Sequence, residues 1–312
     1  MSYKAIWANN TPYSKFLISV GIILLSSVLF TLLSAILAQA IFGISMENLG
    51  LLMNDLTNPE NINVLKMVQT VSSIGTFILP PLLLAWLFHQ SPSVFLSLDK
   101  KASALASVMV TLMLLIAIPF INHLGEMNSY FHLPSFMKGL EEWMRTSEAQ
   151  AAKITEAFLV MNTPGDLVFN LFMIALIPAI GEELLFRGLV QNIFAGWLKN
   201  KHVAVWLSAI LFSAMHMQFY GFIPRLLLGA MLGYLLVWSG SLYLPILAHF
   251  INNAAAVIFT YTYQNKLSTF NADTVGVGGG QGGILLFSIS FTAILLYAIY
   301  RESRRKALLS GL

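Results

Sequence analysis

The sequence predicts an all-α integral membrane protein, built as a polytopic bundle of about eight transmembrane helices. Of its 312 residues, 57% are hydrophobic and only 10% are charged, whereas a soluble protein carries about 25% charged residues. Apolar runs long enough to cross a bilayer recur along the whole chain. The net charge of +3 is small and scattered, so it gives no support to nucleic-acid binding.

Eight apolar runs account for most of the chain, and each is expected to form one span. They cover residues 16–42, 67–88, 104–124, 167–186, 203–217, 223–238, 244–262 and 283–300. The fifth and sixth runs are short and need neighbouring helices to complete a crossing. Pro80 and Pro81 interrupt the second run, and a kink is expected there because each proline removes a helical donor.

Basic residues divide unequally between the two sides of the predicted bundle. Ten of them flank the spans on one side: Lys4, Lys15, Lys100, Lys101, Lys199, Lys201, Arg301, Arg304, Arg305 and Lys306. Because basic loops stay in the cytoplasm, both termini are predicted to be cytoplasmic. The protein is expected to reside in the cell (inner) membrane, with membrane lipids around it.

Composition divides the chain into four parts. Residues 1–124 hold three spans, and residues 125–166 form the longest polar loop. Residues 167–262 carry polar motifs on four spans and are the expected catalytic core. Residues 263–312 contain a glycine-rich loop, the last span and a basic tail.

The polar loop has the pattern of a membrane-surface helix. Phe136, Leu140, Trp143 and Met144 recur at helical spacing, with charged residues elsewhere around the helix. Ser147 and Gln150 have the spacing of a capping box, which predicts a second helix after the first. We expect amphipathic helices on the membrane surface, with a lid over the site as the alternative.

Three polar motifs interrupt the apolar core. They are Glu182-Glu183-x-x-x-Arg187, Phe212-x-x-x-His216 and His249-x-x-x-Asn253. Ionisable groups within a span are costly, and they usually mark a functional site whose partners lie on other spans. The three motifs are therefore expected to form one site.

The spacing assigns different roles to the two glutamates. Glu183 and Arg187 are four residues apart, so they share a helix face and can form an ion pair. Glu182 is rotated by about 100° from Glu183 and has no cation next to it in the sequence. We therefore interpret Glu183 and Arg187 as a supporting pair, with Phe212 nearby, and Glu182 as the reactive carboxylate.

The histidines and Asn253 allow two versions of the chemistry. In one, Glu182 and His216 activate a water molecule, and His249 and Asn253 donate hydrogen bonds to an oxyanion. In the other, Glu182, His216 and His249 bind zinc and leave a position for water. The chain has no cysteine and no HExxH motif. The spacing leaves open whether the cofactor is zinc or nothing beyond a catalytic water.

The remaining intramembrane cation and histidines are given structural roles. Arg225 opens the sixth span and could face the site or the interface; packing is the favoured interpretation. His89, His123, His132 and His202 lie at span ends or in loops, and we interpret them as ordinary interfacial residues.

The three motifs, in this order, resemble those of the CPBP family, the CAAX proteases and bacteriocin-processing enzymes also called Abi proteins. The runs Arg225-Leu-Leu-Leu-Gly229 and Pro245-Ile-Leu-Ala-His249 are also similar to this family, and the resemblance covers about residues 167–259. It implies an intramembrane endopeptidase like the type II CAAX prenyl endopeptidases, often labelled metalloproteases. It also implies that Glu182 and His216 activate water and that His249 and Asn253 form the oxyanion hole.

The resulting hypothesis is an endopeptidase that cleaves a membrane-associated or lipidated peptide. The first alternative is a proton-coupled transporter that uses the same polar residues as a relay. The second is a catalytically idle membrane scaffold. Peptide-bond hydrolysis itself is implied by the family resemblance and not by the spacing of the residues.

Overall fold

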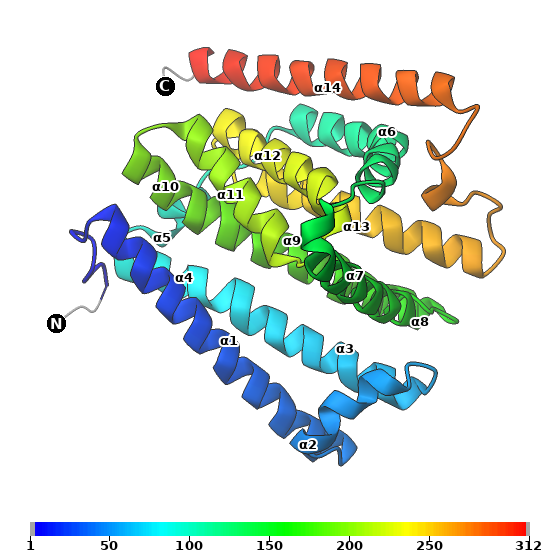
Figure 1. Ribbon diagram of the computed structural model, residues 1–312. Coiled ribbons are helices and arrows are strands. Elements are labelled where there is room, and N and C mark those ends of the chain that lie inside the picture. The colour runs from blue at the N-terminus through cyan, green and yellow to red at the C-terminus, as the bar shows by residue number, and fades with distance from the viewer. Residues whose placement is uncertain (1–3, 310–312) are drawn as a thin grey trace.

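The computed structural model describes residues 4–309, and within this range the chain forms helices and no strands (Figure 1). Within the described residues, seven helices are long and apolar enough to cross a membrane. They span Pro12–Phe42, Pro59–Phe88, Ala104–Ser129, Pro164–Leu198, Phe219–Ser239, Tyr243–Gln264 and Gly282–Arg305. The prediction of an all-α polytopic bundle is confirmed.

Several spans are assembled from consecutive helical segments. The principal helices are α1 (Pro12–Phe42), α3 (Pro59–Ser73), α4 (Leu79–Phe88), α6 (Ala104–Ser129), α7 (Lys138–Phe158), α8 (Pro164–Asn170), α9 (Ile177–Glu182), α10 (Gln191–Leu198), α11 (Lys201–Met215), α12 (Phe222–Ser239), α13 (Tyr243–Gln264) and α14 (Gly282–Leu309). Two short helices, α2 (Met46–Leu49) and α5 (Pro92–Phe95), lie in connections. The pairs α1 with α3, α11 with α12, and α14 with α6 pack against each other.

The fifth apolar run forms a helix too short for a full crossing, as its length indicated, whereas the sixth, also expected to be short, lies in a helix long enough to cross. Helix α11 has 15 residues, a length of about 22 Å, whereas the hydrocarbon core is about 30 Å thick. It nevertheless reverses the chain between α10 and α12, and Figure 1 places both termini at the same end of the bundle. That arrangement agrees with an even number of crossings, while the side that faces the cytoplasm stays a prediction.

The polar loop contains one long helix instead of two. Helix α6 continues to Ser129, and α7 runs without a break through Ser147. The predicted capping box at Ser147 and Gln150 is therefore wrong. A capping box does form at the start of α8, where the Thr163 hydroxyl accepts from the Asp166 amide and the Asp166 carboxylate accepts from the Thr163 amide.

Three stretches within the spans are π-helical, with wider turns than the α-helix. They are Ile74–Ile78, Leu171–Leu176 and Glu183–Val190. The first two lie just before Pro80 and Pro178, and a proline has no amide hydrogen to continue the α-helical pattern. A π-helical turn thus precedes Pro80 and Pro81, and the kink expected at these prolines stays a prediction. The third stretch contains the Glu183–Arg187 motif, in keeping with the occurrence of π-bulges at functional sites.

Gly181 allows the span Pro164–Leu198 to pack closely against the span Pro59–Phe88. A Cβ atom added at Gly181 would lie 2.7 Å from the Cβ atom of Phe77 and 3.1 Å from a side-chain carbon of Ile78. A Cβ atom added at Gly196, further along the same span, would meet nothing within 4 Å. The close contact at Gly181 therefore fixes the helix one residue before Glu182.

Replacing each of these two glycines by alanine distinguishes the effect of close packing on the free energy of unfolding from the effect of helix propensity. Gly181→Ala is expected to lower the free energy of unfolding by about 1–3 kcal/mol, because the added methyl overpacks the contact with Phe77. Gly196→Ala should be neutral or stabilising by up to about 1 kcal/mol. Unfolding of the purified variants in detergent measures both, and equal stability of the two would contradict the tight contact.

Candidate active site

A single cavity brings together the four residues predicted to be catalytic. Glu182, His216, His249 and Asn253 all line a space of about 500 Å³. They come from the end of α9, the end of α11 and the middle of α13. Helix α7 supplies part of the opposite wall through Ala151, Ile154, Thr155 and Phe158. The expectation that the three motifs converge is met by this arrangement.

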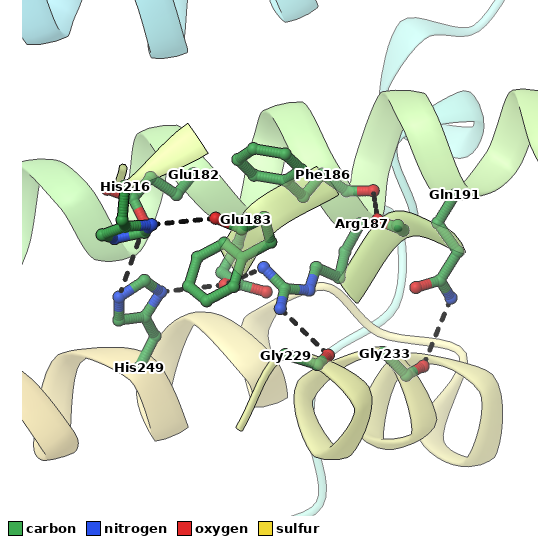
Figure 2. Close-up of polar contacts among 11 residues, drawn as sticks. Glu182, Glu183, Phe186, Arg187, Gln191, His216, Gly229, Gly233 and His249 are labelled. Atoms are coloured by element: carbon green, nitrogen blue, oxygen red, sulfur yellow. Dashed lines mark hydrogen bonds and ion pairs between the residues drawn. The ribbon is translucent and has the colours of Figure 1, made fainter. Parts of the chain in front are cut away.

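Behind the cavity, Glu183 joins an arginine and a histidine (Figure 2). Its Oε1 atom accepts from Nη1 of Arg187 at 2.8 Å and lies 2.8 Å from Nδ1 of His249. All three side chains are buried, with exposed fractions of 0%, 1% and 4% respectively. Because a buried carboxylate is costly unless it is paired and hydrogen-bonded, Glu183 can be buried here only with Arg187 and His249 beside it. The predicted pair of Glu183 and Arg187 is present, and His249 extends it.

Arg187 is held on its other sides by α12 and by an aromatic ring. Its Nη2 atom donates to the main-chain carbonyl of Gly229 at 3.0 Å, and its guanidinium carbon lies 4.5 Å from the centre of the Phe212 ring. Phe212 also meets the rings of His216 and His249 edge-on, with centroid separations of 5.0 and 5.9 Å. Phe212 therefore supports both histidines, as well as the arginine.

Glu182 faces the cavity and differs in this respect from its neighbour. Its side chain is 13% exposed, and its Oε2 atom lies 3.8 Å from Nε2 of His249. Among the described residues, that oxygen has no hydrogen-bond partner although it is buried. A buried oxygen left without a partner is unusual in proteins. The Oε2 atom of Glu183 also has no partner among the described residues, but that side chain is fully enclosed, so Glu182 differs from Glu183 in facing the cavity.

The end of α11 positions His216. The helix stops at Met215, and the His216 amide donates to the carbonyl of Ser213 instead of that of Phe212. Nδ1 of the His216 ring lies 2.8 Å from the Phe212 carbonyl oxygen and caps it. Because a carbonyl can only accept, Nδ1 must carry the hydrogen. In the neutral ring, Nε2 is then the nitrogen with a free lone pair.

A proline explains the position of Asn253. In a regular α-helix the carbonyl of Ile174 would accept from residue 178, but Pro178 has no amide hydrogen. The Asn253 side chain donates to the Ile174 carbonyl instead, at 3.2 Å. Its own oxygen accepts from the Asn252 side chain at 3.1 Å. One hydrogen of the Asn253 amide group thus bonds the Ile174 carbonyl and holds α13 against that span. The second hydrogen is free to bond a ligand.

The residues present do not fit the zinc version of the site as they are arranged. Within residues 4–309, no group of three His, Cys, Asp or Glu side chains is placed to hold a metal ion. The Nδ1 atoms of His249 and His216 face Glu183 and a carbonyl, contacts that zinc-bound imidazoles also make. The mismatch lies in the placement of the candidate side chains relative to one another.

Part of the cavity wall was not predicted from the sequence. Arg225, for which packing was favoured, lines the cavity together with Gln218, Gln69 and Asn252. Helix α7 covers the site through apolar and small residues that carry no chemical signal in the sequence. Arg225 did have a signal, since it is a cation within an apolar segment.

Comparison with known proteins confirms the resemblance to the CAAX proteases. Residues 164–255 match the family described as type II CAAX prenyl endopeptidase Rce1-like. The chain is 30% identical over 89 residues to the uncharacterized protein YpbD of Bacillus subtilis (strain 168), and the match covers 27% of this chain and 42% of YpbD. It thus spans less than half the length of this curated relative. No solved structure matches significantly.

Residues 164–255 are therefore similar to the CAAX protease family, and they lie within an integral membrane protein. All three motifs fall inside the matched range. The matched family is described as one of endopeptidases, and the matched range includes helices long and apolar enough to cross a membrane.

Removal of Arg187 tests the buried cluster. Arg187→Met is expected to lower the free energy of unfolding by about 3–5 kcal/mol, because it leaves Glu183 buried without its cation. Lys138→Met is the control, since Lys138 forms an exposed pair with Glu142 at 3.7 Å and its loss should cost less than about 1 kcal/mol. Similar losses in the two variants would argue against the cluster as a stabilising element.

Proposed function

We propose that the protein is an intramembrane endopeptidase that uses a glutamate-activated water molecule. The observation that carries the proposal is that the Glu182 carboxylate faces one cavity with His216, His249 and Asn253, and has an oxygen without a hydrogen-bond partner among the described residues. A carboxylate with a free oxygen can accept a proton from water. The two histidines and the amide provide the further hydrogen-bonding groups that acyl transfer requires.

In the proposed reaction, water is bound between Glu182 and the free Nε2 atom of His216. Glu182 takes a proton as the water oxygen attacks the scissile carbonyl carbon, and a tetrahedral intermediate forms. Glu182 then passes this proton to the leaving nitrogen while the carbon–nitrogen bond breaks. The products are a carboxylic acid and an amine, and Glu182 returns to its starting state.

The developing oxyanion receives hydrogen bonds from His249 and Asn253. Because Nδ1 of His249 already donates to Glu183, a second donation from Nε2 requires the imidazolium form. Glu183 and Glu182 flank this ring on opposite nitrogens, so a positive charge is compensated there. With Arg187 included, the cluster then contains two cations and two anions.

The proposed substrate is a membrane-associated or lipidated peptide. The cavity lies among helices that are apolar over membrane-spanning lengths, which favours a peptide that reaches the site from the bilayer. The family description adds prenylated proteins as one class of candidate. Residues 164–255 hold every group used in the proposed reaction, so the expected catalytic core of residues 167–262 is retained as a proposal.

Replacement of Glu182 tests the proposal directly. A quenched-fluorescent library of lipidated peptides is incubated with purified wild-type protein and with Glu182→Gln, which keeps the shape of the side chain. Cleavage by the variant should fall by about 10²–10⁴-fold, because the general base is lost. Lys138→Gln, an exposed change on α7, should retain full activity. Undiminished cleavage by Glu182→Gln would refute the mechanism, and a proton relay would show no cleavage by any form.

Chelation tests the choice between the two versions of the chemistry. Because the described donors do not converge on a metal, wild-type cleavage is expected to persist after prolonged incubation with a strong chelator. A loss of activity that returns on addition of zinc would show instead that Glu182, His216 and His249 rearrange around the ion.

A further inference from the structure

Arg225 is a cation inside the catalytic cavity that the proposed reaction does not use. It lies in the first turn of α12 (Phe222–Ser239) and is half-buried. Its side chain lines the same cavity as Glu182 and His249. An arginine at such a position is expensive to maintain in a membrane protein and usually has a functional reason.

The guanidinium of Arg225 is held by a neutral residue. Nη1 donates to the main-chain carbonyl of Gln218 at 3.0 Å, and Nη2 donates to the Gln218 side-chain oxygen. Two of its five N–H groups are used in these bonds, so three remain. No ion pair joins Arg225 to an acidic residue within the described chain, in contrast to Arg187 and Arg145. Glu148 and Glu182 act on its charge only from a greater distance.

A glycine makes room for the guanidinium. A Cβ atom added at Gly221 would lie 2.7 Å from both Nη1 and Nη2 of Arg225. A side chain at position 221 would therefore push the charged group aside. The arginine head is fixed on one side by Gln218 and passes closely over Gly221, so its remaining donors have a defined direction.

We propose that Arg225 binds a carboxylate of the peptide substrate and so determines where the peptide is cut. The inference rests on the proposed endopeptidase function. A planar guanidinium with free donors matches a carboxylate and can bind it with two parallel hydrogen bonds. The positive charge also offsets the repulsion between that carboxylate and Glu182. Because both residues line one cavity of about 500 Å³, the cut falls within a few residues of the bound carboxylate.

A carboxylate can come from the C-terminus of the peptide or from an aspartate side chain, and a binding experiment separates the two. The full-length protein carrying Glu182→Gln, in phosphatidylcholine nanodiscs, is mixed with a library of apolar hexapeptides. Each peptide is present as a free acid, as a C-terminal amide, and as an amide with one internal aspartate. Peptides that co-purify with the protein are counted by mass spectrometry.

We expect at least one carboxylate-bearing form to be retained about tenfold over the plain amide. This excess should disappear when Arg225→Gln is added and should shrink when Gly221→Ala is added, which displaces the guanidinium but keeps its charge. Lys138→Gln, which removes an exposed charge, should leave the excess unchanged. Comparison of the free acid with the internal aspartate identifies the source of the carboxylate.

Equal retention of all three forms, or the same excess with and without Arg225, would overturn the proposal. Unfolding in detergent shows whether Arg225→Gln is still folded, and Gly221→Ala provides a second test if it is not. Binding is measured apart from cleavage. A protein that selects carboxylates but cleaves nothing would therefore refute the endopeptidase function while supporting the binding site.

Discussion

The site depends on one buried carboxylate, that of Glu183, which contacts the Arg187 guanidinium on one side and the His249 ring on the other. Without Arg187 and His249 its charge would be too costly to bury among apolar helices. Without Glu183, the His249 ring would lose the contact that fixes its orientation toward Glu182. The same contacts tie the π-helical stretch Glu183–Val190 to α12 and α13. The contacts of Glu183 therefore both stabilise the helix bundle and fix the geometry of the cavity.

The two adjacent glutamates lie in different environments because the helix points them in different directions. Glu183 is fully enclosed and contacts Arg187 and His249, whereas Glu182 reaches the cavity. The same holds for the two histidines. Each has one nitrogen committed to the protein, His216 to a carbonyl and His249 to Glu183, and each presents the other nitrogen to the cavity.

Local sequence rules accounted for the bundle, the motifs and the Glu183–Arg187 pair, because hydropathy and four-residue spacing act within one helix. Contacts between helices were beyond these rules. The hydrogen bond of His249 to Glu183 joins residues 66 positions apart, and the position of Arg225 depends on Gln218 across a turn. The single helix α7 was also missed, since the capping motif at Ser147 is a weak signal when Glu148, Ala149 and Ala151, which follow it, favour helix.

The carbonyl of Ile174 shows how the backbone of one span can orient a side chain of another. Pro178 lacks the amide hydrogen that an α-helix would direct at that carbonyl, and the Asn253 side chain donates to it. The orientation of the Asn253 side chain on α13 therefore depends on a backbone carbonyl of another span, next to a proline. A comparison of polar residues alone would not reveal this contact.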